Sequence, residues 1–285
     1  MAITFTNQAT LSYNGTQVLS NVAVGVLESP LSVTKTAVAD EYSAGDTVTY
    51  AVSIINSSAA EITGLTVTDD LGAYDFNGET LVPLTYEDGS VLYFSSGVLL
   101  PDPAVSTDDG LTFSGITVPA DGSVIIIYSA TVNSYAPLAQ GSAINNTVTV
   151  TGACLTTVEA QETITVDDAA QLAVFKSVSP AAVIENGELT YTFLIQNTGS
   201  TAVTDAVITD TFDPVLLGVG VTLDGAPLTA ADYSYDEATG VFRTAEGIIT
   251  VPAATAEQDP ETGEWTVVPG SVTLTVTGTV CATSV

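Results

Sequence analysis

Apolar and polar residues alternate along most of the chain, and Gly, Pro and Asp separate the alternating runs. Alternation with a period of two predicts half-buried β-strands. Residues that favour helices are scarce, whereas Val, Ile, Leu and Thr dominate. Strand signals that recur about every ten residues favour β-sandwiches. The pattern therefore predicts an all-β protein.

The alternating pattern occurs twice. LSVTKTAVADEYSAGDTVTYAVSIINSS begins at Leu31, and LAVFKSVSPAAVIENGELTYTFLIQNTG begins at Leu172. One constant spacing aligns the two copies and pairs Lys35 with Lys176, Tyr50 with Tyr191, Asn56 with Asn197 and Asp69 with Asp210. SVIIIYSATV later aligns with SVTLTVTGTV at a larger spacing, so we expect an insertion in the second copy. ATAEQDPETGEW has the composition of a loop and is its expected place.

The two copies end differently. After Val132 the first copy continues with AINNTVTVTG and TVEAQETITV, which predict a closing hairpin, whereas CATSV follows Val280 in the second copy. FTNQATLSYNG and QVLSNVAVGVL, which precede the first copy, match that closing hairpin, with Asn7 aligned to Asn146 and Val24 to Ile164. We therefore expect the N-terminal hairpin to complete the second copy of another chain.

These patterns predict three parts: a donor hairpin at 1–28, an immunoglobulin-like β-sandwich at 29–168, and an incomplete one at 169–285 that the next subunit completes. The expected partners are copies of the chain itself in a head-to-tail homopolymer. The residues expected to face the acceptor core are Ala9, Leu11, Tyr13, Val22, Val24 and Val26.

The net charge of −30 comes from 33 acidic and 3 basic residues. Nucleic-acid binding is excluded, because three basic residues cannot build a basic patch. Acidic pairs such as Asp69–Asp70 and Asp167–Asp168 leave calcium open as an alternative. No D-x-D-x-D-G loop is present, so no metal or cofactor is predicted.

Histidine is absent, which rules out Ser-His-Asp and Cys-His catalytic arrangements. No glycine-rich phosphate loop is present either, so we expect a structural or binding protein and no enzyme. MAITFTNQAT lacks the basic and apolar regions of a secretory signal, and no apolar run has the length of a membrane span. We expect no membrane insertion and no signal peptide.

The chain has two lysines, Lys35 and Lys176, at the same position of the two copies. Each copy has an aligned acid, Asp69 or Asp210, and the two hairpins have an aligned amide, Asn146 or Asn7. A desolvated lysine is a nucleophile, and a protonated carboxyl can polarise a carboxamide. The set resembles the self-forming isopeptide triads of bacterial surface adhesins.

That resemblance implies a Lys35–Asn146 bond within a chain and a Lys176–Asn7 bond between chains, with Asn145 as the competitor of Asn146. The alternative is a buried Lys–Asp ion pair in which the asparagine satisfies backbone groups.

Two cysteines offer a second kind of link. Cys154 falls in the turn of the first closing hairpin, and Cys281 follows the last strand. If strands alternate in direction, both lie at the junction between subunits, where an intermolecular disulfide is geometrically reasonable. The alternative is two inert small hydrophobic residues.

SVTKTAVADEYSAGDTVTYAVSIIN and GLTVTDDLG resemble the conserved-repeat family of bacterial surface proteins known as domain of unknown function 11. The resemblance covers both copies and implies immunoglobulin-like sandwiches without enzyme activity. A short member of this family without a signal peptide and with an unpaired N-terminal hairpin is also similar to subunits of clostridial spore appendages, which implies a fibre on a spore or cell surface.

Two other interpretations stay open. One is a monomeric adhesin or ligand-binding module, in which the N-terminal hairpin packs on its own first sandwich. The other is an acidic calcium-binding surface protein.

Overall fold

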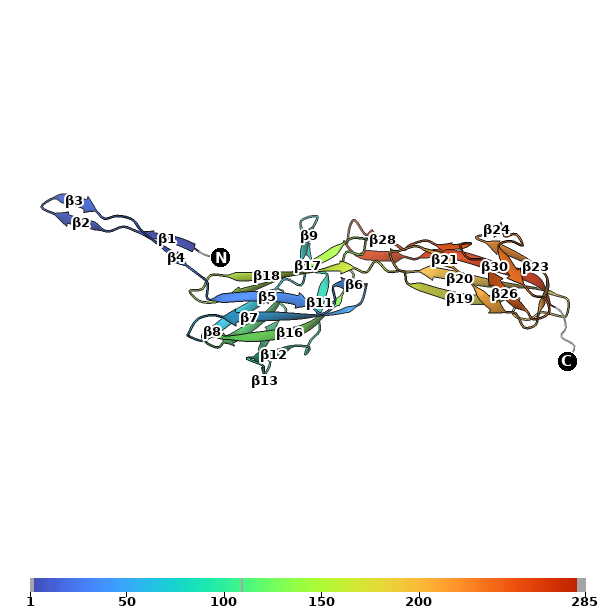
Figure 1. Cartoon of the computed structure of the whole chain (residues 1–285), viewed down its shortest axis with the longest axis horizontal. Coiled ribbons are helices and arrows are strands. Elements are labelled where there is room, and N and C mark those ends of the chain that lie inside the picture. The colour runs from blue at the N-terminus through green and yellow to red at the C-terminus, as the bar shows by residue number, and fades with distance from the viewer. Residues whose placement is uncertain (1–2, 109, 281–285) are drawn as a thin grey trace. The chain divides into compact units, whose positions relative to one another are not determined.

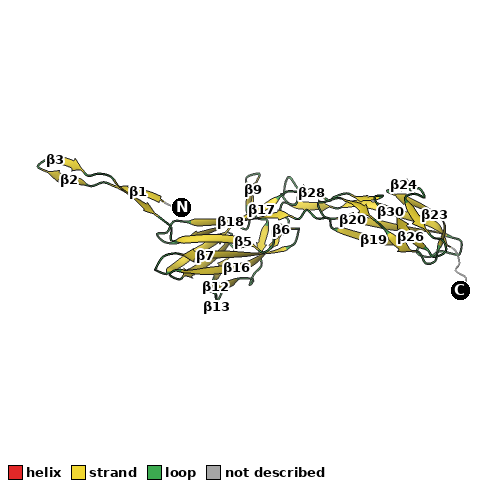
Figure 2. Ribbon diagram, viewed as in Figure 1, coloured by secondary structure: helices red, strands yellow, loops and turns green. Residues whose placement is uncertain are grey.

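The computed structural model describes residues 3–108 and 110–280. These residues form β-strands joined by turns and loops, as Figure 2 shows, and they contain no helix, so none that could span a membrane. The all-β prediction is confirmed. Two compact units are present: residues 1–137 with 143–165, and residues 138–142 with 166–285.

The first unit contains a two-sheet sandwich, whose strands can be followed in Figure 1. One sheet consists, in spatial order, of β13 (Val98–Leu100), β12 (Leu92–Ser95), β16 (Gly122–Val132), β7 (Thr47–Asn56) and β5 (Leu31–Ala37), with β11 (Leu84–Tyr86) also paired to β16. The other consists of β14 (Ala104–Ser106), β15 (Leu111–Val118), β8 (Ile62–Asp69), β17 (Ala143–Thr151), β18 (Val158–Val166) and β6 (Glu41–Tyr42). A small hairpin is formed by β9 (Tyr74–Phe76) and β10 (Glu79–Leu81).

Alternation explains the core of this sandwich. On β7 every second side chain is buried, namely Val48, Tyr50, Val52 and Ile54. β17 follows the same rule with Ile144, Asn146, Val148 and Val150. Burial of large aliphatic and aromatic side chains is the main favourable term in folding.

The second unit repeats this design with fewer strands. Its larger sheet consists of β19 (Leu172–Ser179), β20 (Glu188–Asn197), β30 (Gly270–Val280), β23 (Leu216–Leu223) and β24 (Ala226–Pro227). The remaining pairings join β21 (Val203–Ala206) to β27 (Ile249–Val251), β22 (Thr209–Thr211) to β26 (Val241–Thr244), and β26 to β25 (Tyr233–Tyr235).

The sequence predicted a loop for the inserted segment, but the structure forms a hairpin there. β28 (Thr255–Gln258) and β29 (Trp265–Val268) pair as a hairpin. The Asp259 carboxylate accepts backbone hydrogen bonds from Glu261 and Thr262, which closes the turn and brings the two flanks into register. Only the turn has the loop conformation that its Pro, Gly and acidic residues predict.

The internal repeat is confirmed by register. Ile55 lies opposite Ser123 in the first sandwich, and the aligned Gln196 lies opposite Ser271 in the second. Asn56 and Asn197 are both fully buried. The Nδ2 atom of each donates at 2.7 Å to a carbonyl four residues later, that of Ala60 or Thr201.

The two sandwiches differ at one strand position. β8 is paired on both sides, with β15 and with β17. Within the described residues, its counterparts β21 and β22 are paired only with β27 and β26. The second sandwich therefore has an open sheet edge where the first has its closing hairpin.

β19, the strand of the other sheet that corresponds to β5, is also uncovered. β5 contacts β17 across the first sandwich, and Leu31 on β5 is 5% exposed. The aligned Leu172 on β19 is 46% exposed. Val174 and Val178 share its face and are exposed as well. The inward face of β19 thus lacks the layer that covers β5.

The N-terminal hairpin (residues 3–27) has four short strands. They are β1 (Ile3–Asn7), β2 (Thr10–Tyr13), β3 (Thr16–Leu19) and β4 (Ala23–Leu27). β1 pairs with β4, and β2 pairs with β3. All residues from 4 to 28 are exposed except Gly25, which is half-buried. The apolar side chains of this hairpin are therefore without a core of their own.

The buried asparagines give a first prediction. We expect Asn56→Ala to lower the free energy of unfolding of the first sandwich by about 2–3 kcal/mol, because the Val118 and Pro119 carbonyls lose a buried donor. Urea denaturation measures this change. The control is Ser57→Ala, which removes one exposed hydrogen bond to Pro30 and should change stability by less than about 0.5 kcal/mol. Equal losses of stability in the two variants would contradict a specific stabilising role for the buried Asn56 side chain.

Candidate functional site

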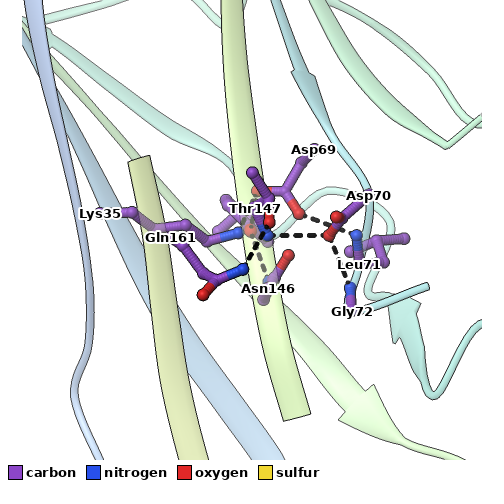
Figure 3. Close-up of polar contacts among 9 residues, drawn as sticks. Lys35, Asp69, Asp70, Leu71, Gly72, Asn146, Thr147 and Gln161 are labelled. Carbon is purple, nitrogen blue, oxygen red and sulfur yellow. Dashed lines mark hydrogen bonds and ion pairs between the residues drawn. The ribbon is translucent and has the colours of Figure 1, made fainter. Parts of the chain in front are cut away.

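Three strands bring the predicted triad of the first sandwich together. Lys35 lies on β5, Asp69 at the end of β8 and Asn146 on β17, all at inward positions of their strands. Lys35 Nζ lies 2.5 Å from Asp69 Oδ2, and both side chains are 0% exposed. Asn146 is also fully buried. Figure 3 shows the three side chains.

A tyrosine connects the acid to the amide. Tyr128 on β16 donates its hydroxyl to Asp69 Oδ2 at 2.5 Å, and Asn146 Nδ2 donates to the Tyr128 hydroxyl at 3.4 Å. Sequence reasoning missed this residue. The alternation of SVIIIYSATV does place Tyr128 on the buried face, but it does not show that the hydroxyl meets Asp69.

The strand end around Asp69 is held by backbone hydrogen bonds. Asp69 Oδ1 accepts from the Leu71 N–H at 3.0 Å. The neighbouring Asp70 Oδ1 accepts from Gly72 at 2.9 Å and from Thr147 on β17 at 2.8 Å (Figure 3). Asp70 therefore ties the turn after β8 to β17, which fixes Asn146 relative to Asp69.

Two buried polar atoms of the site, Asn146 Oδ1 and the hydroxyl oxygen of Tyr50, have no hydrogen-bond partner. A buried carbonyl oxygen without a donor costs about 1–3 kcal/mol. Buried groups left unsatisfied in this way often mark a reactive or strained site.

Burial shifts both ionisable groups toward their neutral forms. Desolvation lowers the pKa of Lys35, and the nearby Asp69 opposes that shift. Desolvation also raises the pKa of Asp69, against the effect of Lys35. A neutral amine beside a neutral acid binds the same number of protons as the ion pair. The reactive form is thus reached by one proton transfer from Lys35 to Asp69, without exchange with solvent.

Aromatic rings surround the Lys35 amine. Nζ lies 4.8 Å from the ring centroid of Tyr50 and 5.9 Å from that of Tyr128. Burial raises the pKa of both tyrosines, so they remain neutral phenols at physiological pH. The rings exclude water from Nζ, which disfavours its charge, although their faces attract an ammonium ion and Asp69 also favours it.

The second sandwich holds the aligned pair in a different environment. Lys176 on β19 forms an ion pair with Asp210 on β22, but their side chains are 40% and 20% exposed. Lys176 Nζ lies 4.7 Å from the Tyr191 ring centroid, as Lys35 lies over Tyr50. Val276 stands where the first sandwich has Tyr128, and no described strand occupies the place of β17. Within the described residues, no asparagine takes the place of Asn146 at this site.

The hairpin places Asn7 at the end of β1, opposite Ala23. β2 and β3 pair Leu11 with Val18, which is the register of the aligned Val150 and Val158 in the closing hairpin. β1 and β4 are one residue out of step with that register, and Val24 lies opposite Thr6 and Val26 opposite Thr4.

This register bears on the predicted donor face. Residues that lie opposite each other in a hairpin share a face. Val24 and Val26 therefore share a face with threonines, not with Asn7. A one-residue shift between β1 and β4 would move both valines to the face of Asn7.

The cysteines are only partly described. Cys154 lies in the turn between β17 and β18, as predicted, and is exposed, with a positive φ of 62°. Cys281 lies outside the described residues. The disulfide between them stays a prediction.

The acidic pairs have other partners in the structure. Asp69 binds Lys35, and Asp70 binds backbone N–H groups, as above. Asp167 Oδ1 accepts from the Ala169 N–H. Across residues 3–108 and 110–280, no group of three or more acidic or cysteine side chains has a spacing that could hold a metal ion.

Comparisons with known proteins give distant structural similarity. No protein-family model and no curated protein matches the chain. The structure is similar to BcpA, the major pilin subunit of Bacillus cereus, with a TM-score of 0.36 at 13% identity over 85% of this chain and 66% of that one. The pilus backbone RrgB from Streptococcus pneumoniae gives a TM-score of 0.34 at 16% identity over 84% of this chain and 55% of that one.

The chain thus spans less than two thirds of the first of these pilins and little more than half of the second. Similarity this distant does not bear on function, which has to be argued from the residues of this chain.

The hydroxyl of Tyr128 gives a second prediction. We expect Tyr128→Phe to lower the free energy of unfolding by about 1–2 kcal/mol, because Asp69 loses a buried donor while the ring packing is kept. Thermal or urea unfolding measures it. Tyr86→Phe alters a half-buried ring beside Tyr128 and serves as the control, with an expected change below about 0.5 kcal/mol. A loss as large in the control would refute a specific role for the Tyr128 hydroxyl.

Proposed function

We propose that the chain is a structural subunit of a surface fibre, which assembles head to tail when the N-terminal hairpin of one copy completes the second sandwich of the next. The observation that carries the proposal is the inward face of β19, which is exposed where the aligned face of β5 is buried under β17. An open edge and an apolar face of this kind call for a covering strand.

The N-terminal hairpin fits this place because it matches the closing hairpin of the first sandwich. In the docked form β1 and β2 take the position of β17, beside β21 and β22, and β3 and β4 take that of β18. Every second residue of an extended strand shares one face, so Phe5, Ala9 and Leu11 would cover the core as Ile144, Val148 and Val150 do.

Main-chain pairing and apolar burial both favour the docked state. Strand addition satisfies the unpaired backbone groups of the open edge. Each large apolar side chain that becomes buried contributes roughly 1.5–3 kcal/mol, so five or six contribute roughly 8–18 kcal/mol, a gain of the same order as the roughly 4–15 kcal/mol lost in translational and rotational freedom on association. The hairpin and its acceptor lie on different parts of the chain, so the contact is heterologous, and it propagates as an open filament where the rotation between subunits does not close a ring.

Within the first sandwich we propose an amide bond between Lys35 and Asn146. After one proton has moved from the Lys35 ammonium to Asp69, the neutral amine attacks Asn146 Cγ. Asp69 gives that proton to the leaving Nδ2 and takes a second one from the attacking nitrogen, and ammonia departs. Two observations support this chemistry: the Lys35–Asp69 pair is fully buried, and Asn146 Oδ1 has no hydrogen-bond partner. Such a bond ties β5 of one sheet to β17 of the other.

Two further features belong to the proposal. A disulfide between Cys154 and Cys281 of successive subunits would add a second link at the junction. The surface-protein family that both repeats resemble implies a fibre on a bacterial cell or spore.

A pair of single substitutions tests the assembly. We expect Leu11→Asp to abolish filaments in electron micrographs, because a carboxylate would have to enter the acceptor core. Ser12→Asp, on the other face of the same strand, should leave filaments intact. Deletion of residues 1–27 should also leave monomers. Filaments formed by the Leu11→Asp protein or the deletion protein would overturn the proposal and favour a monomeric surface module that associates by another route.

Intact mass measures the internal bond. In monomeric Leu11→Asp protein, denatured and reduced, we expect a mass lower than the sequence mass by one ammonia. Adding Asn146→Ala should restore the full calculated mass, whereas adding Asn145→Ala, at the exposed neighbour of Asn146, should not. A full-mass Leu11→Asp protein would mean that Lys35 and Asp69 form only an ion pair.

A further inference from the structure

The second-sandwich site (Lys176 and Asp210) is half of a reactive site. It repeats the lysine, the acid and the tyrosine ring of the first sandwich, in the same order and on aligned strands. It differs in two respects: the lysine is 40% exposed, and no carboxamide among the described residues takes the place of Asn146. Both differences fit the lack of a described strand at the place of β17.

A strand at the place of β17 would both cover the lysine and supply a carboxamide. In the first sandwich Val148 on β17 lies opposite Asp69, and Asn146 is two residues before it on the same face. Ala9 aligns with Val148 and Asn7 with Asn146. A hairpin docked in the register of β17 therefore places Ala9 opposite Asp210 and Asn7 beside the Lys176–Asp210 pair.

Docking also changes the environment of the lysine. The face of β19 that carries Lys176 is exposed, with Leu172, Val174 and Val178 beside it. A covering hairpin would remove water from this face. Desolvation disfavours the charged form of an amine, as the lowered pKa of the buried Lys35 illustrates. Lys176 Nζ already lies within 5.4 Å of the ring centroids of Tyr191, Phe193 and Phe212, and the hairpin would close its remaining exposed side.

We propose that docking activates a covalent link between subunits, an amide bond from Lys176 to Asn7 of the partner subunit. The inference rests on the proposed function, since only assembly brings the two residues together. A free subunit cannot make this bond, because its Lys176 is solvated and faces no amide. The fibre would therefore become covalent one junction at a time, after each hairpin has docked.

The chemistry balances without a co-reactant. The Lys176 nitrogen attacks the amide carbon, Cγ, of Asn7 of the partner subunit, and the Nζ–Cγ bond forms. Before the attack, Asp210 takes one proton from the Lys176 ammonium, which leaves a neutral amine; it then gives that proton to Nδ2 and takes a second one from the attacking nitrogen. The Cγ–Nδ2 bond breaks, and ammonia leaves. No atom is oxidised or reduced.

Denaturing gels of assembled filaments, boiled in detergent with reductant, test this bond. We expect a ladder of multimers from the unaltered protein and from Asn146→Ala, which lacks only the internal bond. Lys176→Ala and Asn7→Ala should still form filaments in electron micrographs but run as monomers. Gln8→Ala, next to Asn7 in the sequence, should keep the ladder.

A mixture of the two inactive variants gives a sharper test. Asn7 of the Lys176→Ala protein can still react with Lys176 of the Asn7→Ala protein. Neither product can extend further, so the covalent species should stop at dimers. Mass spectrometry of the dimer should find a peptide that joins Lys176 to Asn7 with the loss of one ammonia.

The outcomes separate the inference from the proposal on which it rests. Unaltered filaments that dissolve to monomers overturn the cross-link and leave hairpin docking in place. A ladder that persists in Asn7→Ala or Lys176→Ala also overturns it. If no filaments form from the unaltered protein, the proposed assembly itself fails.

Discussion

A strand in the middle of a sheet must be paired on both sides, and the strand that faces it across a sandwich must be covered. The first sandwich meets both requirements with one hairpin: β17 pairs with β8 and lies over β5, so that Leu31 and Lys35 are buried. The second sandwich has the counterparts of β8 and β5 without a described counterpart of β17. Its open edge, its exposed β19 and the accessibility of Lys176 all follow from that difference.

The same hairpin position controls the chemistry of the lysines. Lys35 and Lys176 occupy aligned places, each beside an aspartate and over a tyrosine ring. In the covered site, burial works against both charges and the amide of Asn146 lies close by. In the uncovered site, the Lys176 and Asp210 side chains are partly exposed to solvent. In the proposed fibre, covering the sheet and forming a reactive amine would be one physical event, so that subunits would become linked only where they have docked.

In the proposed fibre, the N-terminal hairpin is the complement of this uncovered site. Its residues are exposed almost throughout, and its distal half already has the register of β17 and β18. The half that carries Asn7 is one residue out of step, with Phe5 opposite Gly25 and Val24 opposite Thr6. A hairpin without a core to pack on has little to hold its register. Docking would supply the core that favours the register of the closing hairpin.

Much of this could be predicted from the amino-acid sequence. Alternation gave the strands, and the repeat gave the aligned lysines, acids and buried asparagines, because both depend on local side-chain order along a pleated strand. Other features needed the tertiary structure: the Tyr128 bond to Asp69, the tie from Asp70 to Thr147, the hairpin in the inserted segment, and the register of β1 with β4. Each depends on which strands lie side by side and on which atoms meet across them. The burial of Lys35 and the exposure of Lys176 belong to this second group, because two similar sequences differ there only in the strand that covers them.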